Sequence, residues 1–332
     1  MLHKTWFRYT LNAVCILLLF GFISLLVSSG VVNRYQAMIL IPVGYNIIIA
    51  TSLNLATGFL GQLPLGHAGF MSVGGYASAL FSLAMDWPAA IEFPVALLIG
   101  GLVAAVFGML IGLPALRLKG DYLAIITLGF GEIIRVIILN LKFTGGAFGL
   151  RGIENHTTLT NTFVWVVISL FVISALIKSR HGRAIVAIRE NEIAAESVGI
   201  STTYYKMMAF TVSAFFAGIA GGLCAHYLTL LNAGDFGFMR SVEILVMVVL
   251  GGMGSVIGSV VAAIVLTLLP ELLRGFADYR LVIYSLLLVI MMIFRPSGLF
   301  GRYDFSLSNL LLKIKEKLSS LSRKKGATHH GS

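Results

Sequence analysis

The chain has 332 residues, of which 58% are hydrophobic and only 11% are charged, whereas a soluble domain carries about 25% charged residues. This composition excludes a soluble globular protein and indicates a polytopic membrane protein. The formal net charge of +10 does not indicate a nucleic-acid partner, because the basic residues gather in short loops and in the C-terminal tail, as the positive-inside rule describes.

The N-terminal apolar run, residues 11–27, is expected to be a retained first helix with its N-terminus inside. A cleaved signal peptide is the alternative, but the run is longer than the usual hydrophobic region of such a peptide. Five further crossings are expected in the first half, at residues 37–55, 66–84, 93–113, 122–141 and 163–177. The loop with Asp86 and Glu92 then lies outside, and the loop with Arg117 and Lys119 lies inside.

A long polar segment, residues 178–199 (KSRHGRAIVAIRENEIAAESVG), follows these crossings, and their number places it in the cytoplasm. On a continuous helix Arg189, Glu192 and Glu196 form one charged stripe. Small apolar residues form a strip on the opposite side, namely Ala184, Ala187, Ala194 and Val198. The pattern alone fits a helix that lies against another protein and equally fits an ordinary cytoplasmic loop.

The second half is expected to begin with a span near residues 207–230 and an external loop with Asp235 and Arg240. The following apolar run, residues 244–269, is interrupted by the sequence GGMGS at 251–255. One uninterrupted crossing here would leave the basic tail outside. Charge parity therefore predicts two short segments that turn back to the same side, with two tilted full crossings as the alternative, before residues 281–294 cross inward.

A second glycine-rich interruption, TGFLGQLPLGHAG at residues 57–69, lies in the first half. Glycine and proline at membrane depth release backbone groups, which protein or a water-filled pathway must satisfy. Interrupted segments in both halves are a sequence signature of a translocation path. The candidates to line the path are therefore Asn54, Gln62 and His67. Each of these residue types more often forms a hydrogen bond between helices than a contact with substrate.

Glu132 and Arg135 are the remaining path candidates. They are three residues apart in an otherwise apolar span, where an unpaired charge is costly, so they are expected to pair with each other or to face the bundle interior. No catalytic set accompanies them. The sequence has no phosphate-binding loop, its 7 histidines lack metal-ligand spacing, and its 2 cysteines lie in apolar runs.

These patterns predict an all-α, polytopic membrane helical bundle of about 8–10 transmembrane segments, with glycine-broken or re-entrant segments in each half. A single transmembrane domain is expected over residues 1–301, and it includes a cytoplasmic polar segment at 178–205. Residues 302–332 are expected to form a basic cytoplasmic tail.

Several stretches resemble the membrane subunits of branched-chain amino-acid ABC importers. They are residues 52–79 (SLNLATGFLGQLPLGHAGFMSVGGYASA), 118–135 (LKGDYLAIITLGFGEIIR), 144–153 (TGGAFGLRGI), 182–200 (GRAIVAIRENEIAAESVGI), 245–263 (LVMVVLGGMGSVIGSVVAA) and 295–301 (RPSGLFG). The resemblance covers residues 52–301 in the family's order. It is closer to the second permease of the pair than to the first.

The resemblance implies a permease subunit that imports leucine, isoleucine and valine across a bacterial plasma membrane. It implies a heterodimer with a second permease, two cytoplasmic ATPase subunits that bind the ATP, and an extracytoplasmic solute-binding protein. The chain itself is then no enzyme and binds no cofactor or metal. A urea or short-chain amide importer is the nearest alternative. An ion-coupled secondary transporter is a more distant one, since it would favour several buried acidic residues.

The resemblance also identifies the polar segment as the part that docks into a cleft of the ATPase. Ala194, Ala195 and Gly199 match the A-A-x-x-x-G part of the importer docking motif, while Ile193 stands where the general motif has Glu. The expected ATPase-coupling residues are Gly182, Arg183, Ala187, Arg189, Glu190, Asn191, Glu192, Ala194, Ala195, Glu196 and Gly199.

Overall fold

Long apolar runs fold into helices throughout the part of the chain that the computed structural model describes, which is residues 33–85, 87–118 and 120–273 with Gly21 and a few single positions from 279 to 293. The chain divides into two units, Met1–Asn33 with Tyr303–Ser332, and Arg34–Arg302. The second unit carries every helix with described bounds. The helix expected at residues 11–27, the crossing expected at 281–294 and the tail at 302–332 lie outside the described residues.

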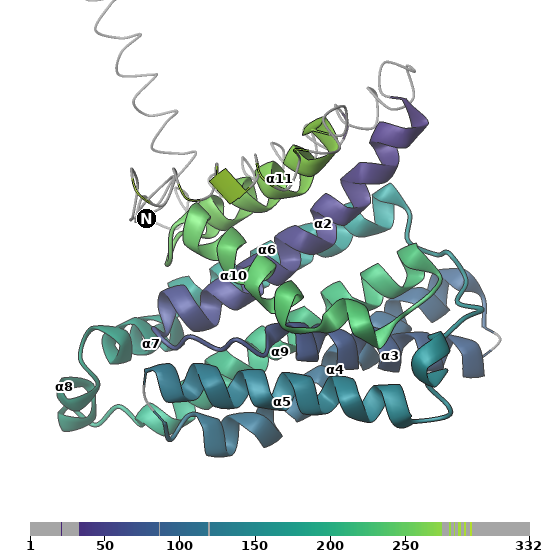
Figure 1. The fold of residues 1–332 in the computed structure, drawn as a ribbon. Helices are drawn as coiled ribbons and strands as arrows, with labels where there is room; N and C mark the ends of the chain where they lie inside the picture. The colour runs from purple at the N-terminus through teal and green to yellow at the C-terminus, as the bar shows by residue number, and fades with distance from the viewer. Residues whose placement is uncertain are drawn as a thin grey trace, which may run out of the picture. The chain divides into compact units, whose positions relative to one another are not determined.

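The helices follow the order predicted from the sequence (Figure 1). Their bounds are α2 (Arg34–Asn54) with its π-helical continuation η1 (Leu55–Phe59), α3 (His67–Ala84), α4 (Ala89–Ala115), α5 (Asp121–Asn140), α6 (Leu159–Lys178), α7 (Arg180–Glu190), α8 (Glu192–Ser197), α9 (Thr202–Leu228), α10 (Phe238–Gly251) and α11 (Val256–Leu272), with short 3-10 turns η2 (Gly146–Phe148) and η3 (Ala233–Phe236). Five of the described helices are long and apolar enough to cross a membrane, namely Ala37–Phe59, α4, α5, α6 and α9. The prediction of an all-α polytopic membrane bundle is confirmed.

The helices α3, α4 and α9 pack against one another through glycine. A methyl group at Gly74 of α3 would lie 2.2 Å from the Cα atom of Gly218 in α9. One at Gly221 of α9 would lie 1.9 Å from the carbonyl oxygen of Met71. Lipid offers no hydrophobic force for helix association, so close backbone approach and van der Waals contact hold these helices together.

Hydrogen bonds along α2 show that α11 runs antiparallel to it. Tyr35, at the beginning of α2, donates to Glu271 at the end of α11 over 2.5 Å. Asn54, at the end of α2, donates to Ser259 near the beginning of α11 over 2.8 Å. The chain therefore returns along α2 after the interruption between α10 and α11.

The helix α10 runs beside only the second half of α2. Arg240, in the first turn of α10, donates to Oδ1 of Asn46 in the middle of α2 over 2.7 Å, and the backbone N–H of Gly254, just after α10, donates to Asn54. The GGMGS sequence is thus the turn of a hairpin, in agreement with the predicted broken element. The sequence places Asp235 and Arg240 in an external loop. For Arg240 this expectation is wrong, because Arg240 lies in α10 and contacts the middle of α2.

Candidate functional site

The glycine-rich interruption predicted in the first half is present. The helix α2 widens into η1, and residues 60–66 are not helical before α3 begins at His67. Gly61 has a φ of 77°, a conformation that residues with side chains rarely adopt. Single π-helical turns frequently mark functional sites, because they disturb the regular hydrogen-bond ladder of a helix.

Asn54 joins this interruption to the one in the second half. Its Oδ1 accepts from the backbone N–H of Gly254 at 2.8 Å, and its Nδ2 donates to the carbonyl oxygen of Ser255 at 2.9 Å and to Ser259. The side chain is fully buried. Asn54 therefore forms hydrogen bonds with backbone groups of the GGMGS turn. This contact corresponds to the alternative role expected for Asn54, a hydrogen bond between helices.

The other two candidates around the first interruption differ in exposure. His67 is buried, and its Nε2 shares a hydrogen bond of 2.9 Å with the hydroxyl of Ser52. It thus connects α3 to α2. Gln62 is partly exposed, and its backbone N–H donates to the carbonyl oxygen of Ala56 over 3.0 Å. Of these two residues, only Gln62 presents a partly exposed side chain.

The polar segment folds as two helices, α7 and α8, which Figure 1 shows projecting at one edge of the described bundle. Asn191 separates them with an extended backbone, and its Oδ1 accepts from the backbone N–H of Ala194 at 3.0 Å. Asn is among the preferred residues for such an N-cap. The continuous helix expected from the sequence is therefore wrong.

The charged stripe expected on that helix is wrong as well, because its three members point to different places. Arg189 reaches Gly58 in η1. Glu192 forms an ion pair of 2.7 Å with Lys206 of α9, whose side chain is only 4% exposed. Glu196 is exposed. The buried Lys206 was not identified from the sequence, since nothing in the spacing connects it to Glu192.

Arg189 links α7 to both glycine interruptions. Its Nη1 donates to the carbonyl oxygen of Gly58 over 2.6 Å. A methyl group at Gly61 would lie 2.7 Å from the Cγ atom of Arg189, and one at Gly254 would lie 3.2 Å from its Nη1. The guanidinium also pairs with the neighbouring Glu190. The absence of side chains at both interruptions thus leaves the space that Arg189 occupies.

The inner face of α7 and α8 belongs to an apolar cluster of this chain itself. Its buried members are Leu55, Phe59 and Leu60 around η1, Ile185 and Ile188 of α7, Ala195 of α8 and Ala209 of α9. Ala195 is 4% exposed. It therefore packs inside this chain, and the expectation that Ala195 lies on a docking surface beside Ala194 is wrong.

The outer face of α8 remains exposed and partly apolar. Ile193 is 78% exposed and Val198 is 75% exposed, with Ala194 and Gly199 also exposed beside them. Gly199 has a φ of 84°, which suits the end of a helix. Among the other expected coupling residues, three are exposed, namely Arg183, Glu190 and Asn191. Ala187 is half-buried and Gly182 is buried.

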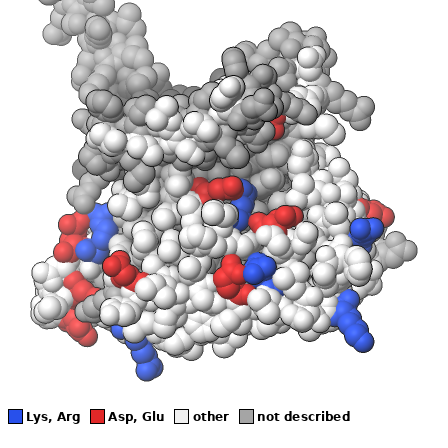
Figure 2. All heavy atoms as spheres, in the orientation of Figure 1, with Lys and Arg blue, Asp and Glu red and all other residues white. Residues whose placement is uncertain are grey.

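A cleft of about 410 Å³ lies between α5 and the beginning of α10. The predicted pair of Glu132 and Arg135 lines it and is confirmed, with Nε of Arg135 2.7 Å from Oε2 of Glu132. A second pair joins Arg240 to Glu243 over 2.9 Å. Asp235 of η3 adds a third carboxylate. Acidic and basic side chains lie together near the middle of the face in Figure 2.

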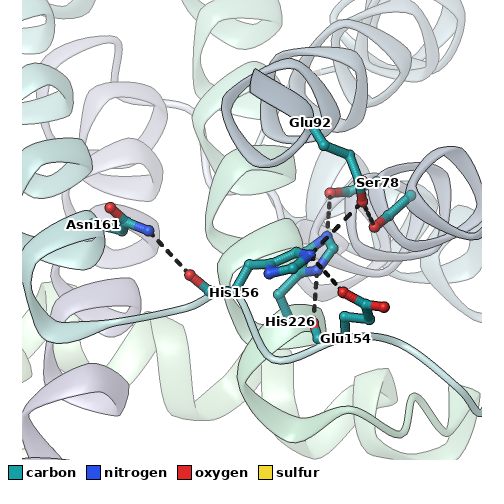
Figure 3. Close-up of polar contacts among 7 residues, drawn as sticks. Ser78, Glu92, Glu154, His156, Asn161 and His226 are labelled. Carbon is teal, nitrogen blue, oxygen red and sulfur yellow. Dashed lines mark hydrogen bonds and ion pairs between the residues drawn. The ribbon is translucent and has the colours of Figure 1, made fainter. Parts of the chain in front are cut away.

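A second polar cluster, missed by sequence reasoning, connects α3, α4, α9 and the loop before α6 (Figure 3). Nε2 of His156 lies 3.8 Å from Glu92 and 3.2 Å from Glu154. Its ring stacks on His226 with centroids 6.0 Å apart. Glu92, expected in the external loop with Asp86, lies in the first turn of α4, is 6% exposed and accepts from Ser82. The described residues contain no group that could hold a metal ion.

Comparison with known proteins assigns the chain to a family. The family model described as branched-chain amino acid transport system / permease component matches residues 35–295. The high-affinity branched-chain amino acid transport system permease protein LivM of Salmonella typhimurium is 40% identical over 288 residues, which cover 76% of this chain and 67% of LivM. LivM of Escherichia coli K12 is 41% identical with the same coverage.

The permease protein LivH of Escherichia coli K12 is 24% identical over 281 residues, which cover 77% of this chain and 91% of LivH. The higher identity to LivM confirms the resemblance to the second permease of the pair. No solved structure gives a significant match. The family model and the LivM relatives both extend over most of the chain, and the protein belongs to the family of permease components of branched-chain amino acid transport systems.

Proposed function

We propose that this chain is a permease subunit of an ATP-binding-cassette importer that moves leucine, isoleucine and valine across a bacterial inner membrane. The names of the LivM and LivH relatives support the substrate class. The structural observation that carries the proposal is the position of Arg189, which lies on the polar segment and contacts the interrupted elements of both halves. A coupling segment requires such a connection between a docking surface and the helices that change conformation.

Two cytoplasmic ATPase subunits are the proposed partners of α7 and α8. The exposed Ile193 and Val198 give the outer face of α8 an apolar surface within a polar segment, and exposed apolar groups of this kind mark protein interaction sites. ATP binding and hydrolysis take place on those partners. This chain belongs to a transport family and is not an enzyme.

A second permease is the proposed partner within the membrane. Only 28% of an apolar 18-residue stretch of α5 and 22% of one in α6 are buried within this chain, compared with 78% of such a stretch within residues 37–59. The charged cleft also opens on the surface beside α5. Charges at membrane depth are costly against lipid. The cleft therefore faces a water-filled path or the second permease, and an extracytoplasmic binding protein delivers the solute to that path.

Reconstitution tests the proposal. The chain is co-expressed with its partner permease, ATPases and binding protein, and the purified complex is placed in vesicles. We expect ATP-dependent accumulation of radiolabelled leucine that requires the binding protein. Accumulation of urea or acetamide without leucine, isoleucine or valine would assign the chain to the amide importers. Uptake that follows an ion gradient without ATP would reject the importer altogether.

A further inference from the structure

The cleft contains charged groups that are not used in its ion pairs. Arg135 uses Nε for its bond to Glu132, and its terminal guanidinium nitrogens have no hydrogen-bond partner among the described residues. Asp235 is exposed, and it too has no ion-pair partner among the residues that the structure describes. The cleft thus offers one guanidinium fork and one carboxylate that remain open to a ligand.

The position of the cleft places these groups near the middle of the membrane-crossing helices. Glu132 lies near the middle of α5, a helix of 20 residues, and its Oε1 accepts from the backbone N–H of Phe238 at 3.0 Å. Arg240, on the same cleft, contacts Asn46 near the middle of α2. The backbone therefore carries η3 and the first turn of α10 inward to this level, where Asp235 lies beside α5.

The remaining lining completes a surface with charge of both signs and apolar contact. The two cations Arg135 and Arg240 face three carboxylates, Glu132, Asp235 and Glu243, so the lining carries one surplus negative charge. Phe238 and Met239, which are 44% and 72% exposed, add apolar surface at the same place. The volume of about 410 Å³ falls within the usual range for sites that bind small molecules.

We propose that this cleft binds the zwitterionic head group of an α-amino acid during its passage through the importer. Asp235 accepts hydrogen bonds from the ammonium group, the open fork of Arg135 donates to the carboxylate, and Phe238 and Met239 contact an apolar side chain. A guanidinium matches the planar geometry of a carboxylate with two parallel hydrogen bonds. The inference rests on the proposed function, since it takes an amino acid as the cargo.

The chemistry of the cleft also separates amino acids from the alternative cargo. Urea and short-chain amides carry no net charge at either end, so they leave Asp235 and the fork of Arg135 without charged partners. A site whose charged groups match a zwitterion favours it over a neutral ligand, which leaves those groups paired only with water. A zwitterion supplies both partners at once and brings no net charge to the middle of the membrane.

Cysteine protection measures this binding directly in the assembled importer. Met239→Cys places a thiol in the cleft, and its labelling by a small methanethiosulfonate reagent is followed with the loaded binding protein present. The same complex without this substitution gives the background from the native cysteines. We expect leucine to slow labelling. We expect 4-methylpentanoate, which lacks the ammonium group, and 3-methylbutylamine, which lacks the carboxylate, to have no such effect.

Uptake in vesicles provides the second measurement. We expect Asp235→Asn and Arg135→Lys to lower leucine uptake about tenfold, the effect of losing one charge-assisted contact, while the loaded binding protein still stimulates ATP hydrolysis. Asp121→Asn is the matched control, because Asp121 is an exposed carboxylate at the beginning of α5, outside the cleft. It is expected to transport as the unchanged importer does.

The outcomes separate this inference from the proposed function. An unchanged importer that accumulates no leucine rejects the proposed function. An unchanged importer that accumulates leucine, with full uptake in both cleft variants, rejects only the zwitterion site. Equal protection by leucine and the two singly charged analogues also rejects it. If a cleft variant fails to assemble, the protection pattern of the Met239→Cys complex decides alone.

Discussion

The guanidinium of Arg189 donates a hydrogen bond of 2.6 Å to the carbonyl oxygen of Gly58, although 131 positions separate the two residues in the chain. The acceptor lies in η1, where the helix ladder is already disturbed. A displacement of α7 by a partner therefore acts on the interrupted element of the first half without an intermediate residue. Gly254 lies against the same guanidinium, so the interruption of the second half is affected at the same time.

Removing this contact is expected to impair coupling between the permease and its ATPases without preventing their assembly. In Arg189→Ala the bond to Gly58 is lost, and a hydrogen bond to a charged group contributes about 1.5–3 kcal/mol. We expect the ATPases to co-purify, while stimulation of hydrolysis by the loaded binding protein and leucine uptake both fall. Arg180→Ala is the control, because Arg180 is exposed on the same helix and is not one of the expected coupling residues. Equal effects of the two substitutions would show that Arg189 has no special role.

The space beside Arg189 is testable at Gly61. Gly61→Ala meets two penalties, a positive φ that costs about 1–2 kcal/mol for a residue with a side chain and a contact of 2.7 Å with Arg189. Gly199→Ala is the matched control, because Gly199 has a φ of 84° and nothing within 4 Å of the new methyl group. We expect Gly61→Ala to lower the thermal stability of the detergent-solubilised permease by more than Gly199→Ala.

The double variant isolates the steric part of that difference. In Gly61→Ala with Arg189→Ala, the methyl group no longer meets the arginine stem. The added cost of Gly61→Ala should then shrink to that of Gly199→Ala. A cost that is the same with and without Arg189 would mean that other atoms determine the need for glycine at residue 61.

Neighbouring alanines in α8 are expected to respond differently to the same change. Ala194→Trp adds bulk to the exposed face, so the permease should remain abundant in the membrane but lose its ATPases in a pull-down. Ala195→Trp forces a large ring into the cluster around Leu60 and Ile188, and overpacking of this kind costs about 1–3 kcal/mol or more. We therefore expect the Ala195→Trp permease to have a lower thermal stability even without its ATPases. Full ATPase binding by Ala194→Trp would exclude the outer face of α8 as the docking surface.

The ion pair on α5 is expected to show partial compensation. Glu132→Ala leaves Arg135 without its partner, which is more harmful than removing both charges. We expect Glu132→Ala with Arg135→Ala to be more stable than Glu132→Ala alone. It should remain less stable than the unchanged permease, because the backbone N–H of Phe238 also loses its acceptor. Thermal unfolding of the three variants measures the order, and a double variant that is the least stable of them would contradict it.

The sequence predicts those features that depend on local patterns. Apolar runs place the membrane-crossing helices, because each run must match the thickness of a bilayer. The GGMGS sequence places the hairpin turn before Val256, and the spacing of Glu132 and Arg135 predicts their ion pair. Each of these inferences uses residues that are close together in the chain.

Features that depend on distant contacts could not be predicted in this way. The caps of α8 and the break at Asn191 decide that Ala195 faces inward, whereas a continuous helix leaves its direction open. The partners of Arg189, Glu192 and Glu92 come from other helices, and no periodicity in the sequence indicates them. Side-chain hydrogen bonds between segments therefore account for most of the differences between the expected and the observed site.

The contact between Gly74 and Gly218 has a consequence for movement. Where two backbones touch, no side chain can change its rotamer to absorb a shift, so we expect α3 and α9 to move as a rigid body. The turn of the α10–α11 hairpin touches η1 in the same way, because a methyl group at Gly58 would lie 2.1 Å from the backbone nitrogen of Gly254. We therefore expect a displacement of one glycine interruption to be passed directly to the other, so that the two interruptions move together.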